Sequence, residues 1–295
     1  YTESYDKMIL APGAVPLVPG FVENKADRRI FVLKDIPDTL RIKDFVTKNE
    51  VKNAVVIGGG FIGLETAENL AEAGVSTKIV ELSDHVLQQV DWDMAQLIEQ
   101  ELRNGGVDVH CSEKVEAVKS GEDKLMVNTD KGSYEADMVV MSLGVRPGFA
   151  EGAVELNAKG AIVVGDDMRT SNPDIYAAGD AVCVTNAVDG EADYLPLAGP
   201  ANKQGRIAAD NIAGIPSKYT GSQGSSILKV FGKTAARTGL SESRAKNYEK
   251  SYTFSKSHAG YYPGATDMWI KVIFDKDTGK LLGAQAFGED GVDKR

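Results

Sequence analysis

The amino-acid sequence predicts an α/β protein in which two α/β units are followed by an α+β unit. Three observations support this fold class. Strand-like apolar runs alternate with helix-like segments up to about residue 214, a pattern typical of a parallel sheet with helices on its faces. A G-x-G-x-x-G motif joins a strand to a helix at residues 58–63. From Gly224 onward, strands are joined by turns such as Asp277-Thr278-Gly279.

The expected elements follow one another with clear stop signals. Helices are expected at residues 35–48, 61–73, 91–104 and 199–212. Strands are expected at residues 5–10, 53–57, 77–81, 227–231, 268–274 and 281–287, with short strands between 107 and 140 and another that ends at Gly179-Asp180. Gly74 ends the second helix, at a position that favours positive φ, and the Gly105-Gly106 pair ends the third.

Composition and charge exclude several classes of protein. The 295 residues carry 33 Lys and Arg against 43 Asp and Glu, a net charge of −10, and such an acidic surface repels nucleic acid. No apolar run is long enough to span a membrane, and no secretory signal opens the chain. Cys111 and Cys183 stand far apart and His85, His110 and His258 are isolated, so neither a disulfide framework nor a metal site is expected. The few cysteines favour a reducing cytoplasm.

The strongest chemical signal is the glycine motif. Gly58 permits a tight turn, Gly60 lets a pyrophosphate approach the backbone, and Gly63 lets the helix pack on the strand. The helix N-terminus then faces the anion. Glu81 ends the next strand, where a carboxylate would hold the adenosine ribose hydroxyls and repel a 2′-phosphate, so NADH is expected rather than NADPH. The competing interpretation is a glycine-rich turn without a ligand.

The segment from Gly58 to Glu65 resembles the nucleotide-domain motif of the pyridine nucleotide-disulfide oxidoreductases, with an aromatic residue after the second motif glycine and a glutamate beyond it. The resemblance implies that Phe61 covers the flavin face until nicotinamide stacks there. It also implies that Glu65 binds the nicotinamide amide and pairs with a flavin-domain lysine outside this chain. Ile62 belongs to the same NAD-binding motif. The alternatives are plain helix packing for Phe61 and a solvated charge for Glu65.

Two short segments resemble the crossovers that join the flavin and nucleotide domains of this family. They are residues 11–14 (APGA) and 143–147 (LGVRP). The resemblance assigns Pro12 and Gly13 to FAD and Gly144 to NAD. Either segment alone could be an ordinary turn.

Two further segments resemble flavin-binding motifs. Residues 170–180 (TSNPDIYAAGD) are similar to the second FAD motif, in which Gly179 allows close approach and Asp180 accepts hydrogen bonds from the ribityl chain. Residues 196–202 (PLAGPAN) open a helix with a proline near its first turn. The family likeness places this N-terminus at the flavin pyrimidine edge, where its dipole stabilises negative charge on the reduced ring. The residues assigned to FAD there are Leu197, Ala198 and Gly199.

The third unit indicates a subfamily. Residues 258–265 (HAGYYPGA) resemble the interface-domain segment of coenzyme A-disulfide reductases, including the rhodanese-linked type that reduces polysulfide or coenzyme A persulfide. The resemblance implies that Tyr261 or Tyr262 hydrogen-bonds at the active-site sulfur of the partner subunit, and the sequence does not choose between them. The alternative is an aromatic pair packed under the Pro-Gly turn.

The resemblance covers nearly the whole chain and implies two nucleotide-binding Rossmann-like domains, of which the FAD domain is incomplete, and an α+β dimerisation domain. The expected domains are residues 1–20 and 146–216 (FAD), 21–145 (NAD) and 217–295 (dimerisation, incomplete). The family's first FAD motif and redox-active cysteine precede the position of Tyr1, so the sequence is interpreted as an internal part of a longer polypeptide. Cys111 and Cys183 are expected to be structural.

The expected function is that of a FAD-dependent oxidoreductase. It would pass hydride from NADH through flavin to a cysteine and on to coenzyme A disulfide, coenzyme A persulfide or polysulfide, as a cytoplasmic homodimer with coenzyme A as a further ligand. Two alternatives stay open: an NADH oxidase or peroxidase with the same fold, and a non-catalytic NADH-binding module. A reductase that serves a redoxin is less favoured, because it would not need the tyrosine segment.

Overall fold

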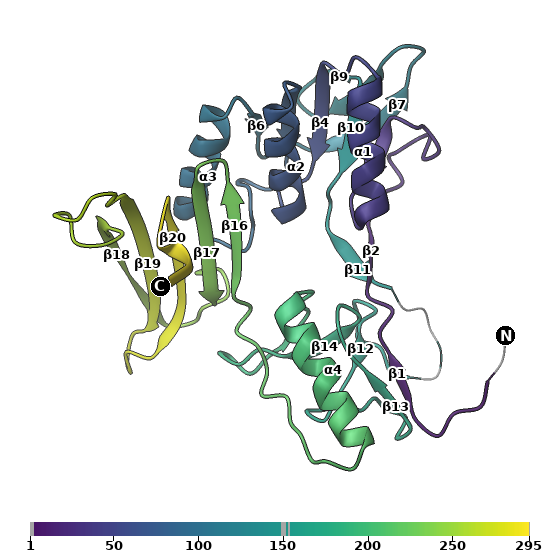
Figure 1. Ribbon diagram of the computed structural model, residues 1–295, viewed down its shortest axis with the longest axis vertical. Coiled ribbons are helices and arrows are strands. Elements are labelled where there is room, and N and C mark those ends of the chain that lie inside the picture. The colour runs from purple at the N-terminus through teal and green to yellow at the C-terminus, as the bar shows by residue number, and fades with distance from the viewer. Residues whose placement is uncertain (1–2, 149–151, 153, 295) are drawn as a thin grey trace. The chain divides into compact units, whose positions relative to one another are not determined.

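The structure, a computed structural model, describes residues 3–148, 152 and 154–294 (Figure 1). The outer limits expected for the first and last domains, residues 1 and 295, lie outside this part of the chain. The chain forms two compact units. The smaller unit combines Tyr1–Val15 with Val145–Ser225, and the larger unit combines Pro16–Gly144 with Ser226–Arg295. Within the described part of the chain, no helix has the length and apolar character needed to cross a bilayer.

The larger unit contains a five-stranded parallel sheet in the order β3-β10-β4-β5-β6. Its strands are β3 (Ile30–Val32), β10 (Met138–Met141), β4 (Asn53–Ile57), β5 (Ser76–Val80) and β6 (Asp108–His110). The helices of this region are α1 (Ile36–Lys48), α2 (Phe61–Glu72) and α3 (Trp92–Asn104). The same region also contains a separate antiparallel sheet of β7 (Val115–Ser120), β8 (Leu125–Thr129) and β9 (Ser133–Ala136). The alternation of strands and helices confirms the expected α/β class.

A second, antiparallel sheet in the larger unit has the order β16-β17-β20-β19-β18. Its strands are β16 (Ser226–Val230), β17 (Lys233–Gly239), β18 (Tyr248–Lys256), β19 (Asp267–Asp275) and β20 (Leu281–Gly288), followed by the 3₁₀ helix η1 (Val292–Lys294). We call it the C-terminal sheet. The sequence pattern predicted β16, β19 and β20 but missed β17 and β18. β18 is exposed along nearly its whole length, so it lacks the apolar alternation that marks a half-buried strand.

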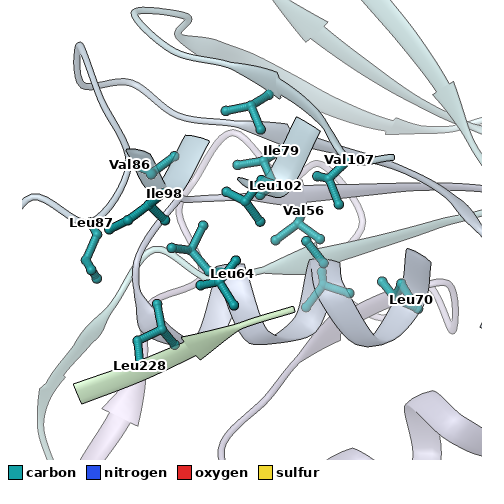
Figure 2. Close-up of a cluster of buried hydrophobic side chains, with 14 of the residues drawn as sticks. Val56, Leu64, Leu70, Ile79, Val86, Leu87, Ile98, Leu102, Val107 and Leu228 are labelled. Carbon is teal, nitrogen blue, oxygen red and sulfur yellow. The ribbon is translucent and has the colours of Figure 1, made fainter. Parts of the chain in front are cut away.

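Buried aliphatic side chains join the parallel sheet, its helices and the C-terminal sheet in one core (Figure 2). Leu64 of α2 and Ile98 of α3 are almost fully buried, and Leu228 of β16 packs in the same cluster. Each such side chain contributes about 1.5–3 kcal/mol when it is removed from water. The two sheets of the larger unit are therefore held together by shared hydrophobic burial.

Among its described residues, the smaller unit contains short strands and one long helix. The strands are β1 (Met8–Leu10), β2 (Ala14–Pro16), β11 (Val145–Pro147), β12 (Ile162–Val163), β13 (Ile175–Ala177), β14 (Val182–Thr185) and β15 (Ala192–Asp193), and the helix is α4 (Ala198–Ile212). The strand expected at residues 5–10 is shorter than expected, because pairing with β13 begins only at Met8 opposite Ile175. The buried side chains of β13 and β14 pack with Ala208 of α4 in a separate core.

Candidate functional site

The glycine turn between β4 and α2 has the geometry of a phosphate cradle. Gly58 has φ +105°, and a Cβ there would lie 2.3 Å from the Ser142 carbonyl oxygen. A Cβ at Gly63 would lie 2.0 Å from the Gly58 carbonyl oxygen. By contrast, a Cβ at Gly60 would meet nothing within 4 Å. Gly58 and Gly63 are thus required by the protein's own packing, whereas the space at Gly60 is open to a ligand.

The open space lies at the N-terminus of α2. Gly60 is the N-cap residue and has no side chain to cap the helix, so the first-turn N–H groups stay available to an anion. The helix dipole adds partial positive charge at the same place. A dinucleotide pyrophosphate fits this donor set without any basic side chain.

Glu81 follows β5 directly and closes one side of the cradle. Its Oε2 accepts a hydrogen bond from the Gly59 N–H at 2.6 Å, and its Oε1 accepts one from the Ser83 N–H at 2.8 Å. Each carboxylate oxygen keeps a second lone pair, which could accept a ribose hydroxyl. Residues 82–90 contain no Lys or Arg that could pair with a 2′-phosphate. The carboxylate therefore fits NADH better than NADPH.

The other expected NAD residues lie on the same helix or at the end of β10. Phe61 and Ile62 are half-buried, and Phe61 packs partly against the core. Glu65 is exposed one turn further along α2, on the same side as Phe61. Gly144 is exposed, has φ +86° and accepts a hydrogen bond from the Leu17 N–H at 3.1 Å. Phe61 and Glu65 thus share one helix face, which leaves both a packing role and a ligand role open to Phe61.

The expected flavin residues lie in the smaller unit. Gly179 has φ +81°, and its N–H donates to Oε1 of Gln204 at 2.8 Å. Burial raises the pKa of the neighbouring Asp180 carboxyl, and its side chain makes no hydrogen bond or ion pair with the residues that the structure describes. Gly13 has φ +69° with open space around it, and Pro12 is exposed. A half-buried carboxylate without a partner fits the hydroxyl groups of a ribityl chain.

The N-terminus of α4 is a second open donor site in the smaller unit. The helix begins at Ala198 after the N-cap residue Leu197, which provides no side-chain cap. Ala198 and Gly199 are exposed, and a Cβ at Gly199 would meet nothing within 4 Å. Backbone N–H groups at this end would favour negative charge on a neighbouring ring.

Sequence reasoning missed two polar residues of the smaller unit. Gln204 is only 1% exposed and faces inward from α4, where it holds the Gly179 N–H. The hydroxyl of Tyr194 is buried and has no hydrogen-bond partner in the described part of the chain. Burial, with the charge of Asp180, raises the pKa of Tyr194 to about 12. Gln204 lies four residues before Ala208, so the two share one face of α4, and this spacing could have indicated that Gln204 is buried. No local sequence pattern indicated a role for Tyr194.

The remaining expected site residues, Tyr261 and Tyr262, are exposed by 85% and 61%. They follow β18, and their rings contact each other with centroids 5.0 Å apart. The aromatic pair is thus not packed under the Pro-Gly turn. Both phenols are available to a second molecule.

Of the two free cysteines, Cys111 does not have the properties of a redox-active thiol. Burial, together with the neighbouring Glu99 carboxylate, raises the pKa of Cys111 to about 12. Cys183 lies within β14 and forms no disulfide. A reactive cysteine needs a lowered pKa, so Cys111 is assigned no catalytic role.

Comparison with known proteins identifies relatives of both sequence and structure. The family model described as pyridine nucleotide-disulphide oxidoreductase matches residues 1–205, and the model for the dimerisation domain of that family matches residues 226–294. The chain is 32% identical to the NAD(P)H sulfur oxidoreductase (CoA-dependent) of Pyrococcus abyssi, over 97% of this chain and 66% of that protein. It is 34% identical to the NADH oxidase of Methanocaldococcus jannaschii, over 99% of this chain and 66% of that protein. A solved NAD-dependent persulfide reductase from A. fulgidus superposes with a TM-score of 0.94 at 35% identity, over 99% of this chain and 56% of that one. The chain thus spans just under two thirds of the length of these two curated relatives.

Proposed function

The chain belongs to the pyridine nucleotide-disulphide oxidoreductase family, and from this we propose that it works as a FAD-dependent oxidoreductase that takes hydride from NADH. The observation that carries the proposal is the glycine cradle of α2, with the Glu81 carboxylate bonded to its Gly59 N–H at 2.6 Å. This arrangement combines an anion site with a ribose acceptor, as a dinucleotide requires. The family to which the chain belongs binds FAD as well as NAD(P)H, and FAD would supply the hydride acceptance and the electron transfer.

The chain's own residues have distinct roles in this proposal. The N-terminus of α2 holds the pyrophosphate, and Glu81 holds the adenosine ribose. Glu65 would bind the nicotinamide amide, and Phe61 would cover the flavin face when no nicotinamide is stacked there. In the smaller unit, Asp180 accepts hydrogen bonds from the ribityl chain.

We further propose that the final acceptor is a thiol- or disulfide-type molecule, namely coenzyme A disulfide, coenzyme A persulfide or polysulfide. Two observations support this: the exposed phenols of Tyr261 and Tyr262, and relatives named as CoA-dependent sulfur oxidoreductase and persulfide reductase. The match to a dimerisation domain supports a homodimer, in which one of these phenols would serve the partner's sulfur site. Neither cysteine of this sequence is assigned the thiol that attacks the acceptor. A cytoplasmic location is proposed from the two free cysteines.

A second candidate function is NADH oxidase, because a relative of that name has 34% identity, close to the 32% of the CoA-dependent sulfur oxidoreductase. It would use the same nucleotide and flavin residues and differ only in the acceptor. The simplest alternative to both is an NADH-binding module without flavin chemistry.

Two measurements separate these functions. An absorption spectrum of the purified protein is recorded without oxygen, before and after one equivalent of NADH. Flavin bands that bleach support the oxidoreductase, and NADH binding without flavin bands supports the module. Turnover is then measured with coenzyme A disulfide or polysulfide and, separately, with oxygen. Turnover with oxygen alone would overturn the thiol or disulfide acceptor in favour of the oxidase.

A further inference from the structure

The loop of residues 82–90 connects β5 to α3 and also forms part of the glycine cradle. Its Leu87 N–H donates to the Gly59 carbonyl oxygen at 2.7 Å, and its Ser83 N–H donates to the Glu81 carboxylate at 2.8 Å. A methyl carbon of Val86 lies 3.0 Å from where a Gly59 Cβ would stand. The position of this loop therefore fixes both the turn at Gly59 and the ribose carboxylate.

The conformation of the loop is one that it would not adopt alone. Leu87 has φ +51°, in the left-handed region that residues other than glycine rarely adopt. Its side chain and that of Val86 are buried in the core beside Ile98 of α3 (Figure 2). The surrounding structure must hold this strained backbone in place.

The loop ends at Asp91, whose side chain does not cap the helix that follows. Asp91 is the N-cap residue of α3, yet its carboxylate makes no cap bond to that helix. Instead it accepts hydrogen bonds from the Gln285 side-chain amide at 2.7 Å and from the Glu242 N–H at 2.8 Å. The Asp91 N–H in turn donates to Oε1 of Gln285 at 2.9 Å. Two bonds in opposite directions thus tie the end of the nucleotide loop to β20 of the C-terminal sheet.

A buried lysine strengthens the same connection. Lys271 of β19 is 0% exposed, and its ammonium lies 2.8 Å from a carboxylate oxygen of Asp91 and 2.8 Å from one of Asp93, with a third contact to Glu242. The three carboxylates lie within 4.8 Å of one another, so without this ammonium they would repel. Burial acts to lower the pKa of Lys271, but the hydrogen bonds to the carboxylates outweigh it and raise that pKa well above its usual range. Lys271, which belongs to the C-terminal sheet, thus provides the positive charge that neutralises these three carboxylates.

From these contacts we propose that Lys271 and Gln285 are positioning residues of the nucleotide site. They hold Asp91, Asp91 holds the loop of residues 82–90, and the loop holds Gly59 and Glu81 in the geometry that binds the adenosine half of NADH. The inference rests on the proposed function, because it takes the cradle as the NADH site. It implies that the C-terminal sheet sets the affinity for NADH and leaves the chemical step alone.

The test uses Gln285→Met, which removes both bonds to Asp91 while nearly keeping the side-chain volume. We expect the Kd for NADH to rise by about three- to tenfold, as for loss of one or two buried hydrogen bonds. The rate of flavin reduction at saturating NADH should stay within about twofold of wild type, because no group that contacts the reacting atoms is changed. Lys256→Met is the matched control, since it removes an exposed ion pair with Asp267 in the same sheet. Its Kd for NADH should equal that of wild type.

A second variant pair excludes a merely structural role. Gln285→Glu alone places two carboxylates together and should weaken NADH binding further. Adding Asp91→Asn removes this repulsion and should recover part of the affinity, because the new amide can donate to the carboxylate at position 285 but no longer pairs with the Lys271 ammonium. Thermal unfolding is followed in parallel, and every Kd is measured well below the melting temperature. Wild-type protein that binds NADH, with variants of lower stability but unchanged Kd, would overturn this inference and leave the proposed function standing. Failure of the wild-type protein to bind NADH would overturn both.

Discussion

In the larger unit the carboxylate of Glu81 accepts hydrogen bonds from two backbone N–H groups, whereas in the smaller unit the carboxylate of Asp180 has no partner among the described residues. The same contrast holds for phenols. Tyr134 of the larger unit donates to Glu113 at 2.8 Å, but the buried hydroxyl of Tyr194 has no partner in the described structure. Buried polar groups are normally satisfied. The glycine cradle is therefore organised by the protein alone, whereas Asp180 and Tyr194 of the smaller unit have an arrangement that a ligand would complete.

The largest expected effect comes from filling the open part of the cradle. Gly60→Val puts a side chain where nothing of the protein lies within 4 Å of a Cβ, in the space assigned to the pyrophosphate. We expect NADH affinity to fall by about a hundredfold, or about 2.7 kcal/mol, with little change in the melting temperature. Titration of protein fluorescence with NADH measures the affinity.

The control for this change is Gly58→Ala, at a glycine that the protein itself requires. Its Cβ would lie 2.3 Å from the Ser142 carbonyl oxygen, at φ +105°. We expect the free energy of unfolding to fall by about 2–4 kcal/mol, as for other strained backbone positions. If Gly60→Val unfolded the protein and Gly58→Ala did not, the assignment of the open space to a ligand would be wrong.

The next effect concerns the choice between the two nicotinamide cofactors. Glu81→Ala removes the charge that repels a 2′-phosphate and the bond that holds the Gly59 N–H. The ratio of NADPH to NADH dissociation constants should fall by about 10–100-fold, the equivalent of one charge-assisted hydrogen bond. Both constants are measured on the same preparation. Glu72→Gln, an exposed change at the end of α2, is the control, and an unchanged ratio in Glu81→Ala would remove the ribose from the role of this residue.

Asp180 allows a pH test of the smaller unit. Its folded pKa is raised by burial above the value in the unfolded chain, so the carboxyl favours folding at low pH and this contribution is lost as the pH rises through the folded pKa. In flavin-free protein, the difference in melting temperature between Asp180→Asn and wild type should therefore grow in favour of the variant from about pH 4 to pH 7. Glu191→Gln, at an exposed carboxylate of the same unit, should show no such trend. In the presence of FAD the order should reverse, with about tenfold weaker flavin binding by Asp180→Asn.

The geometry of the glycine cradle could be predicted because its residues are close together in the sequence, whereas its binding of a nucleotide stays a prediction. A strand, a glycine turn and a helix determine the geometry of Gly58, Gly60 and Gly63 locally, and Glu81 lies at the end of the next strand. The N-terminus of α4 was predictable for the same reason. The structure places its start at Ala198, one residue before the expected position.

The residues that the sequence did not reveal act through contacts between distant segments. Gln204 and Gly179 are 25 residues apart, and Asp91 and Gln285 are 194 residues apart. The hydrophobic periodicity of a sequence does not indicate which polar residue of one element contacts a backbone group of another. The burial of Lys271 is still harder to predict from the sequence, because a lysine within a strand is usually solvated. It can be buried here only because three carboxylates surround its ammonium.

The smallest expected effect on ligand affinity comes from a comparison in which the same atom is removed from both units. Tyr134→Phe deletes a hydroxyl that donates to the buried Glu113 carboxylate, so the free energy of unfolding should fall by about 1–3 kcal/mol. Tyr194→Phe deletes a hydroxyl without a described partner, so the free energy of unfolding of flavin-free protein should stay the same or rise by up to about 1 kcal/mol. With FAD added, Tyr194→Phe should lose about two- to fivefold in flavin affinity and Tyr134→Phe should lose none. Urea unfolding with and without FAD measures all four values. Equal destabilisation by both substitutions in flavin-free protein would show that Tyr194 already has a partner, and the smaller unit would then be organised without a ligand, as the larger unit is.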